Sequence, residues 1–426
     1  MSTYFALVDC NNFYASCERS FNPKIWNSPI VVLSNNDGCV IARSNEAKAL
    51  GIGMGTPFWE IKSLVLKHKI QVYSSNYQLY GDMSSRVMNI LQDSCMDIEV
   101  YSIDEAFLKL NPFKINEDQL MQENIILRTN ILRATGIPVS IGIAPTKTLA
   151  KLANHLAKKS TQNGVYILEP DSDILKDIPI EKVWGIGKSF QRRLAKTGVK
   201  SVADLTKISR QWMASEFGVV GVRLLKELQG FSCYDLETPI SQRKNIMVSR
   251  SFSKDVFQLS ELIEGISTYA TRLGEKLRRH NQSTGQLTIF LMANPFRNLR
   301  PDQKKYFSRT IELPLATCAT NELISWSSKV IRFLFEEGTN YKKVGILAGR
   351  LRPSDYIQGN LFVSLDKEKK LKSLMKSMDA INTLQGRNKV YFASCGEKKK
   401  AKWARKEQWC SPRYTTRWKD ILKIKI

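Results

Sequence analysis

The residue pattern changes along the chain in a way that excludes one uniform architecture. Residues 1–170 alternate short apolar strand segments with helical stretches, and residues 172–237 are compact and helical in pattern. A polar, basic stretch at 238–247 precedes a second mixed region at 248–353, and from about 354 the chain becomes polar. Separate runs of strands and helices are typical of α+β folds. We therefore predict an α+β protein, and its 426 residues predict about two to four domains.

The charge balance predicts a polyanionic partner. Lys and Arg number 64 against 40 Asp and Glu, a net charge of +24. Nucleic acid is the first expectation, and an anionic membrane surface is a distant second. A hydrophobic content of 43% excludes disorder of the whole chain.

Several classes of protein are excluded by what the sequence lacks. No apolar run approaches the ~18 residues of a membrane span. The early Asp9 leaves no room for the apolar region of a signal peptide. Eight scattered cysteines without a C-x-x-C pair, and only three histidines, argue against a zinc finger. Free thiols fit a reducing compartment, so we expect a cytoplasmic protein.

Acidic residues stand at the ends of two predicted strands. Asp9 ends the apolar segment 4–10, and Asp104 and Glu105 lie at an acidic turn within 99–110. If these strands are neighbours, three carboxylates come together and repel each other unless cations neutralise them. Mg²⁺ prefers such oxygen ligands, and two ions can clamp a phosphoryl transfer. The pattern alone leaves open that these acids merely end a strand and cap a turn.

Longer segments point to a family. The stretches 9–15 (DCNNFYA) and 101–107 (YSIDEAF) resemble the palm motifs of Y-family, translesion DNA polymerases. Further segments are similar to the UmuC-type members of that family, namely 34–43, 47–51, 75–77, 146–154 and 411–418. The resemblance therefore runs from the first strand to the last ten residues.

The resemblance implies a right-hand polymerase fold with a palm, fingers, a helical thumb that contains a helix–hairpin–helix, and an α/β little finger. The implied domains are a palm at 1–21 and 81–171, fingers at 22–80, a thumb at 172–237, a linker at 238–247, a little finger at 248–353, and a C-terminal tail at 354–426 that carries a clamp-binding peptide.

By the same resemblance, Asp9, Asp104 and Glu105 are the catalytic acids that hold two Mg²⁺ ions, and the backbone carbonyl of Cys10 is an additional ligand. Tyr14 stands five residues after the first acid, where the family keeps its steric gate against the 2′-hydroxyl of ribonucleotides. On residue type alone, core packing is the more common role for a Phe-Tyr pair such as Phe13-Tyr14.

Three basic residues are candidates for the triphosphate: Arg43, Lys48 and Lys147. Lys147 opens the amphipathic helix predicted at 146–158, and a helix N-terminus attracts anions. Lys48 stands where many relatives have arginine, and Asn45 where many have a tyrosine that touches the triphosphate. The alternative for each basic residue is a solvated surface.

Two further motifs point to DNA and to the bacterial sliding clamp. Gly185, Gly187 and Lys188 resemble the turn of a helix–hairpin–helix, whose backbone N–H groups face a phosphate. Such a turn grips a duplex without identifying its sequence, although a G-x-G occurs in any tight turn. The clamp-binding peptide resembles Q-x-x-L-F and comprises Gln358, Leu361 and Phe362.

The last 31 residues, 396–426, carry eight Lys and three Arg against two Glu and one Asp. Binding of nucleic acid, a folded cap for an accessory subunit, and a solvated basic end all remain open for them.

The resemblance implies an error-prone translesion DNA polymerase of the SOS response. Its partners would be primer-template DNA, deoxynucleoside triphosphates, the sliding clamp, a processed UmuD-type dimer and a RecA filament, and it would act on the nucleoid. Two alternatives stay open: a nucleotidyl cyclase, which needs no hairpin or clamp peptide, and a DNA-bound scaffold or accessory protein at stalled forks. The intact acids argue against the scaffold.

Overall fold

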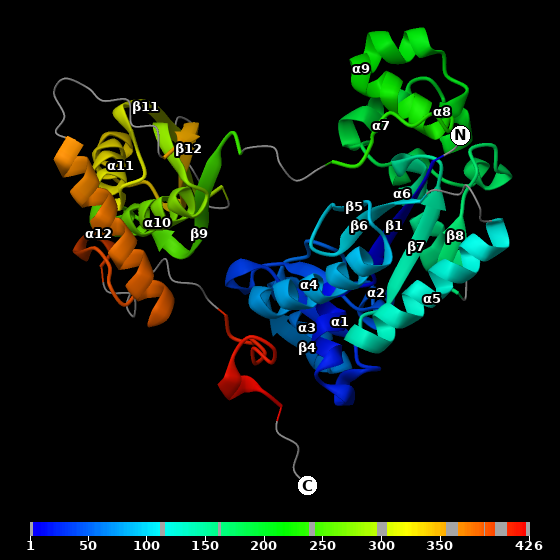
Figure 1. The fold of residues 1–426 in the computed structure, drawn as a ribbon, viewed down its shortest axis with the longest axis horizontal. Helices are drawn as coiled ribbons and strands as arrows, with labels where there is room; N and C mark the ends of the chain where they lie inside the picture. Colours follow the sequence, from blue (N-terminus) through cyan, green and yellow to red (C-terminus); the bar gives the residue numbers. More distant parts are fainter. Residues whose placement is uncertain are drawn as a thin grey trace. The chain divides into compact units, whose positions relative to one another are not determined.

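The computed structural model describes residues 3–110, 116–160, 163–237, 243–295, 305–354, 365–386, 388–396 and 407–422. It divides into two compact units (Figure 1). The first comprises Met1–Ile240 with Glu407–Ile426, and the second comprises Ser241–Lys406. Within the described residues, no helix is both long and apolar enough to cross a membrane.

A five-stranded sheet forms the centre of the first unit. Its order is β5 (Ile98–Val100), β6 (Glu105–Leu110), β1 (Tyr4–Cys10), β7 (Val139–Ala144) and β8 (Val165–Ile167). β1 is antiparallel to both of its neighbours. Alternate residues of a strand face opposite sides of the sheet, so Ala6 and Val8 enter one core while Phe5 and Leu7 enter another.

Helices cover both faces of this sheet (Figure 1). The core around Val8 includes residues of α1 (Phe13–Ser20), α4 (Tyr77–Ser94) and α5 (Glu117–Thr135). The opposite face is covered by α6 (Lys147–Ser160), which confirms the predicted amphipathic helix. Gly142 lets α6 lie close to the sheet, because a Cβ there would lie 2.0 Å from the backbone nitrogen of Asn154.

A second, three-stranded sheet lies in the region expected to be the fingers. Its order is β3 (Val40–Arg43), β2 (Ile30–Leu33) and β4 (Gln71–Ser74). It has its own core with the helices α2 (Asn45–Ala49) and α3 (Phe58–His68). Two short 3₁₀ helices, η1 (Pro23–Ile25) and η2 (Asn35–Asp37), complete this region.

Residues 172–237 are helical, as the sequence predicts. The elements are η3 (Asp173–Lys176), η4 (Ile180–Lys182), α7 (Lys188–Ala195), α8 (Val202–Thr206) and α9 (Arg210–Leu228). Their apolar residues share a core with α6. This packing attaches the helical region to the face of the central sheet that α6 covers.

The second unit is a four-stranded antiparallel sheet with helices against it. The strands lie in the order β11 (Tyr306–Thr317), β10 (Gln282–Ala293), β12 (Tyr341–Pro353) and β9 (Ile246–Val256). Its core joins the sheet to α10 (Leu259–Arg279) and α11 (Thr320–Leu334). The observed architecture confirms the predicted α+β class.

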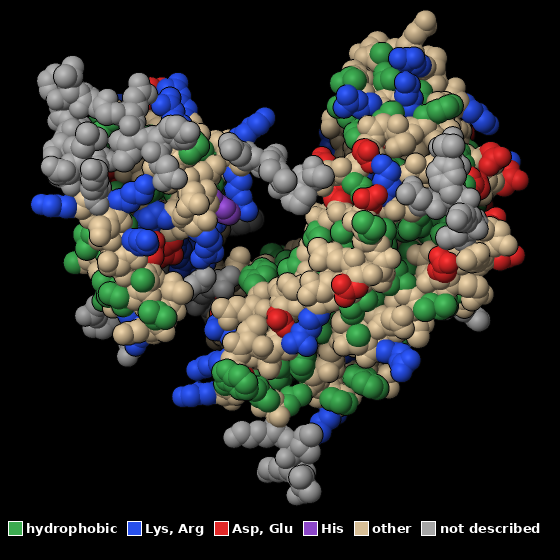
Figure 2. All heavy atoms as spheres, in the orientation of Figure 1, with side chains coloured by type: hydrophobic (Ala, Val, Ile, Leu, Met, Phe, Trp, Pro, Cys, Tyr) green, Lys and Arg blue, Asp and Glu red, His purple; other side chains and the backbone are tan. Residues whose placement is uncertain are grey.

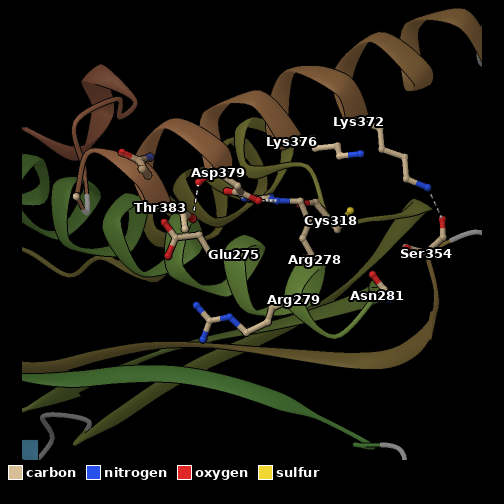
Figure 3. A pocket seen from close by; sticks show the side chains of 12 residues that line it. Glu275, Arg278, Arg279, Asn281, Cys318, Ser354, Lys372, Lys376, Asp379 and Thr383 are labelled. Carbon is tan, nitrogen blue, oxygen red and sulfur yellow. Dashed lines mark hydrogen bonds and ion pairs between the residues drawn. The ribbon is translucent and has the colours of Figure 1, made fainter. Parts of the chain in front are cut away.

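The polar stretch after 353 differs from the single tail that its composition suggests. α12 (Leu365–Leu384) packs in the second unit, where Arg278 of α10 makes two hydrogen bonds to Asp379 at 2.6 and 2.8 Å (Figure 3). The 3₁₀ helix η5 (Ala393–Cys395) also contacts α10. Residues 407–422, which include η7 (Trp418–Asp420), belong instead to the first unit. α12 also buries single apolar side chains such as Met375. The polar composition of the stretch does not indicate that these residues are buried.

Candidate active site

The three predicted acids meet at one end of the central sheet. Asp9 of β1 is the register partner of Glu105 of β6. The backbone N–H of Cys10 donates to the carbonyl of Asp104 at 2.8 Å. Ser102 Oγ donates to Asp104 Oδ1 at 2.6 Å and so orients that carboxylate. Antiparallel pairing brings the end of β1 to the start of β6, which places acids far apart in sequence side by side.

Two lysines of α6 lie against these carboxylates. Lys158 Nζ lies 2.6 Å from Asp9 Oδ1, and Lys151 Nζ lies 3.1 Å from Glu105 Oε2. Burial raises the pKa of Asp9 to about 6, and the charges of Glu105 and Asp104 add to the shift, while Lys158 opposes it. The ammonium groups therefore lie where the repelling carboxylates need positive charge.

The donor set fits a hard divalent cation. Carboxylate oxygens predominate, and Mg²⁺ prefers oxygen. Burial raises the pKa of the Cys10 thiol, so this residue could offer its backbone carbonyl but not a thiolate. Within the described residues, no three His, Cys, Asp or Glu side chains are already grouped to hold a metal ion. Asp9 and Glu105 each have a lysine partner, and Asp104 has a serine partner. Three carboxylates face two ammonium groups here, and a bound cation would balance the remaining negative charge.

A polar hollow of about 500 Å³ lies beside the carboxylates. Residues that line it include Asn11, Asn12, Asn45, Lys48, Arg128 and Lys158. Lys48 Nζ donates to Asn12 Oδ1 at 2.6 Å and to Asn45 Oδ1 at 3.3 Å. A second hollow of about 240 Å³ is lined by Asp9, Glu105 and Lys158 among others. Lys158 therefore lines both the hollow that contains the carboxylates and the larger hollow, which we call the basic hollow because Lys and Arg side chains but, among the described residues, no carboxylates line it.

Positive charge gathers around Lys48. Its pKa is lowered by burial first, then by the charges of Arg43 and Lys158. Arg43 Nε and Nη1 are buried, and within the described residues neither nitrogen has a hydrogen-bond partner. Clustered cations with unsatisfied donors are suited to an anion with several oxygens.

Lys147 lies away from this cluster. Its side chain is 3% exposed, and its ammonium donates to Glu99 and, at 2.8 Å, to the carbonyl of Asp235. This placement argues against the predicted triphosphate contact, because the group is buried and already paired. The sequence analysis missed Lys151 and Lys158. Lys147 and Lys158 are separated by about three helical turns, so both project from one side of α6.

Tyr14 lies at the start of α1 and is only partly buried. Its ring stacks on Tyr80 with the ring centroids 4.3 Å apart, and Tyr77 meets it edge-on at 6.2 Å. Burial raises its pKa to about 12. The ring is therefore held by aromatic neighbours while part of it remains accessible.

The predicted helix–hairpin–helix turn joins η4 to α7. Gly185 has φ +91°, a left-handed conformation that favours glycine, and Gly187 is the N-cap residue of α7, which begins at Lys188. A Cβ at either glycine would meet nothing within 4 Å. The turn is therefore open to a ligand. Lys and Arg side chains are prominent over α7–α9 and on the second unit (Figure 2).

The clamp-type peptide and the α10–α12 cavity share no residue with the carboxylate cluster. The clamp-type residues Gln358, Leu361 and Phe362 lie outside the described residues. A larger cavity of about 760 Å³ lies between α10 and α12 of the second unit (Figure 3). Its Arg278 is occupied by Asp379, by the carbonyl of Cys318 and by Thr320, so we interpret it as the seam that attaches α12.

Models of known protein families match four stretches of the chain. Residues 8–155 match the impB/mucB/samB family, 172–199 match the IMS family HHH motif, and 243–361 match the impB/mucB/samB family C-terminal domain. Residues 372–424 match a domain of unknown function. The match to the HHH motif confirms the predicted helix–hairpin–helix.

Curated relatives span the whole chain. Protein UmuC of Salmonella typhimurium is 38% identical over 99% of this chain and 100% of its own length. Protein ImpB of the same species is 38% identical over 98% of each chain. DNA polymerase IV of Bacillus velezensis is 25% identical over 93% of this chain and 94% of its own.

Solved structures agree on the fold. A Y-family DNA polymerase chimera of Dbh and Dpo4 has a TM-score of 0.67 at 22% identity, covering 82% of this chain and 98% of that chain. An insertion ternary complex of Dbh DNA polymerase has a TM-score of 0.53, covering 81% and 98%. With the palm motifs, the hairpin and these relatives together, the chain belongs to the impB/mucB/samB family and is a UmuC-like Y-family DNA polymerase.

Proposed function

We propose that the chain is an error-prone translesion DNA polymerase that adds deoxynucleotides to a primer opposite damaged template in the SOS response. One observation carries the proposal: Asp9, Asp104 and Glu105 meet at one sheet end beside a basic hollow that Lys48 and Lys158 line. A polymerase site needs carboxylates that hold metal ions and, next to them, basic residues that hold the triphosphate. The carboxylate cluster and the basic hollow beside it provide these two groups.

The carboxylates would serve as metal ligands. Membership of this family implies the use of a divalent metal, and we propose two Mg²⁺ ions held by Asp9, Asp104, Glu105 and the Cys10 carbonyl. When bound, such ions would lower the pKa of the primer 3′-hydroxyl and offset the charge of the triphosphate. The hydroxyl would lose its proton to solvent, its oxygen would form a bond to the α-phosphorus, and the bond between the α-phosphorus and the pyrophosphate oxygen would break. Ser102 and Lys151 keep Asp104 and Glu105 oriented for this work.

The basic hollow would receive the triphosphate. Lys158 and Lys48 line it and are proposed as its ammonium contacts. Arg43 is proposed as a further contact, because two of its guanidinium nitrogens have no hydrogen-bond partner among the described residues and its charge acts on Lys48. An anion in this hollow would compete with Asp9 for Lys158. Tyr14 is proposed as the steric gate, because its stacked ring is fixed yet partly accessible.

The remaining partners are proposed from the sequence and the relatives. Primer-template DNA would be gripped by the turn at Gly185, Gly187 and Lys188, in keeping with the net charge of +24. The peptide 358–362 would bind the sliding clamp. A processed UmuD-type dimer and a RecA filament would activate synthesis on nucleoid DNA in the cytoplasm. We retain the proposed division into palm, fingers, thumb and little finger.

Primer extension on undamaged and abasic templates, with accessory subunit and RecA filament present, tests this function. Extension past the abasic site is the expected result. A protein that binds primer-template normally but extends neither template would instead be a scaffold at stalled forks. Formation of a cyclic nucleotide without primer would indicate a cyclase.

A further inference from the structure

The C-terminal segment 407–422 is held in the first unit by hydrogen bonds from its backbone to two side chains and to the backbone of Ser74. The N–H of Gln408 donates to Asp37 Oδ2 at 2.9 Å, and the N–H of Trp409 donates to Ser74 Oγ at 3.0 Å. The N–H of Ser74 in turn donates to the carbonyl of Trp409 at 3.0 Å. The segment thus continues the hydrogen bonding at the end of β4.

Aromatic contacts hold the same segment from both sides. Trp409 lies against Phe58 of α3, with the ring centroids 5.0 Å apart. Tyr414 stacks on Phe21, just after α1, at 4.9 Å and an interplanar angle of 10°. These anchors do not involve Ser411, which lies between them. The segment can therefore stay in place when the Ser411 hydroxyl alone is removed.

Asn76 fixes the chain around Ser411. This buried side chain accepts from the N–H of Leu79 at 3.4 Å and so caps α4. Its Nδ2 lies within hydrogen-bond distance of the Ser411 carbonyl, Ser411 Oγ and the Pro412 carbonyl, at 3.1, 2.9 and 3.1 Å. With Asn76 as donor, Ser411 Oγ is free to donate its own proton elsewhere.

That proton goes to a buried carboxylate. Ser411 Oγ donates to Glu18 Oε1 at 3.0 Å, and Tyr80 OH donates to the same oxygen at 2.7 Å. Glu18 and Tyr80 are 2% and 0% exposed. The Tyr80 ring is the one on which Tyr14 stacks. A continuous set of contacts therefore runs from the C-terminal segment to the ring proposed as the steric gate.

We propose that Ser411 is a positioning residue for Tyr14, acting through Glu18 and Tyr80, so that part of the domain of unknown function sets sugar selectivity. The inference rests on the proposed role of Tyr14 in the polymerase site. Glu18 Oε1 accepts from both hydroxyls, and these hydrogen bonds oppose the burial that raises the pKa of Glu18 to about 7. Without Ser411, Glu18 and the Tyr80 hydroxyl lose their fixed geometry, and the ring above them can shift.

The test is single-turnover insertion of a deoxynucleotide and the matching ribonucleotide by the full chain with its accessory subunit. Ser411→Ala should raise the ribo/deoxy ratio about five-fold, the factor that one net hydrogen bond is worth. Tyr80→Phe keeps the stacked ring but removes the link, and should raise the ratio similarly. Ser411→Thr keeps a hydroxyl at this position and should give the wild-type ratio. Thr416→Ala, an exposed hydroxyl of the same segment, is the matched control and should change nothing.

Tyr14→Ala and the double variant Tyr14→Ala with Ser411→Ala separate the inference from the proposed function. Tyr14→Ala should raise the ratio by a large factor, and the second change should add nothing, because Ser411 acts only through that ring. If Tyr14→Ala raises the ratio while Ser411→Ala and Tyr80→Phe do not, the positioning role is wrong and the gate stands. If Tyr14→Ala leaves the ratio unchanged, the gate fails and the inference fails with it. Loss of total activity at an unchanged ratio in Ser411→Ala would indicate a structural strut and overturn the proposal.

Discussion

Two carboxylates on consecutive elements, Asp9 of β1 and Glu18 of α1, have different kinds of surroundings. Both have a raised pKa, to about 6 and about 7, and burial is the largest cause for both. Asp9 has an ammonium partner and two carboxylate neighbours, whereas Glu18 has two neutral hydroxyl donors. The first arrangement is suited to exchanging one cation for another. The second is suited to holding a ring in place.

The acidic side of this comparison should be the more sensitive to substitution in activity assays. Asp104→Asn removes charge that the bound cations require, and we expect primer extension to fall by about 10²–10³-fold, as for loss of one key electrostatic group. DNA binding should be nearly unchanged, because the hairpin and the second unit lie outside this cluster. Asp93→Asn, on the exposed side of α4, is the control. Extension at a tenth of the wild-type rate or more would contradict the metal assignment.

The two ends of α6 should separate stability from catalysis. Lys147→Ala leaves Glu99 buried without its ammonium, which should lower the free energy of unfolding by about 3–5 kcal/mol. Lys158→Ala removes a lysine that is 36% exposed, and Asp9, whose pKa burial already raises to about 6, can take up a proton in its place. This substitution should therefore cost less stability than Lys147→Ala but raise the KM for the incoming nucleotide. Denaturant unfolding and nucleotide titrations of both variants measure this. If Lys147→Ala is instead stable and defective in nucleotide binding, Lys147 is the triphosphate contact that the sequence predicts.

Glu18 should show itself in the pH dependence of stability. Its pKa rises from 4.5 in the unfolded chain to about 7 in the fold, so the folded state binds the proton more tightly. The contribution of Glu18 is therefore fully present below pH 4.5 and is lost as pH rises through 7. The loss should be at most about 3 kcal/mol. Glu18→Gln cannot ionise, and its stability relative to wild type should increase between pH 5 and 8. A constant difference across this range would mean that Glu18 is not desolvated in solution.

The cluster of Asp9, Asp104 and Glu105 could be predicted from the sequence, whereas the hydrogen bonds of Glu18 could not. Asp9, Asp104 and Glu105 end or begin apolar strands within motifs that are local in the chain. Glu18 pairs with a serine 393 positions away, and no periodicity links such residues. Lys158 was within reach of the sequence, since it lies on the Lys147 side of α6. The sequence favours Lys147 as the triphosphate contact because it opens the helix and helix N-termini attract anions. In the structure, the buried Glu99 already neutralises Lys147.

Polar composition also hides how the C-terminal stretch is attached. The sequence predicts one polar tail at 354–426 and leaves open a folded cap within its basic end at 396–426. The structure instead attaches it at a few specific points, such as Arg278 with Asp379 and Asn76 with Ser411. A handful of buried contacts can fix a segment whose average composition is that of a solvated chain, because only the contacting residues need leave water.

The smallest expected effect concerns competition for the carboxylates. Lys158 already supplies Asp9 with positive charge, so Mg²⁺ must displace an ammonium group and should bind weakly. Its net stabilisation should be about 1 kcal/mol when the free Mg²⁺ concentration is about four times its dissociation constant. Loss of an active-site residue usually weakens metal binding, but loss of Lys158 should strengthen it because this lysine competes with Mg²⁺ for Asp9. Lys158→Ala should increase the rise in melting temperature that Mg²⁺ causes, even though it weakens nucleotide binding. Asp9→Asn should abolish the rise. Ser411→Ala should leave it unchanged, since the partners of Glu18 among the described residues are two hydroxyls and not an exchangeable cation. Calorimetry of the four proteins with Mg²⁺ and with chelator measures the shift. If Lys158→Ala reduces the Mg²⁺ effect, the lysine assists metal binding instead of competing with it, and the distinction between an exchangeable and a fixed carboxylate does not hold.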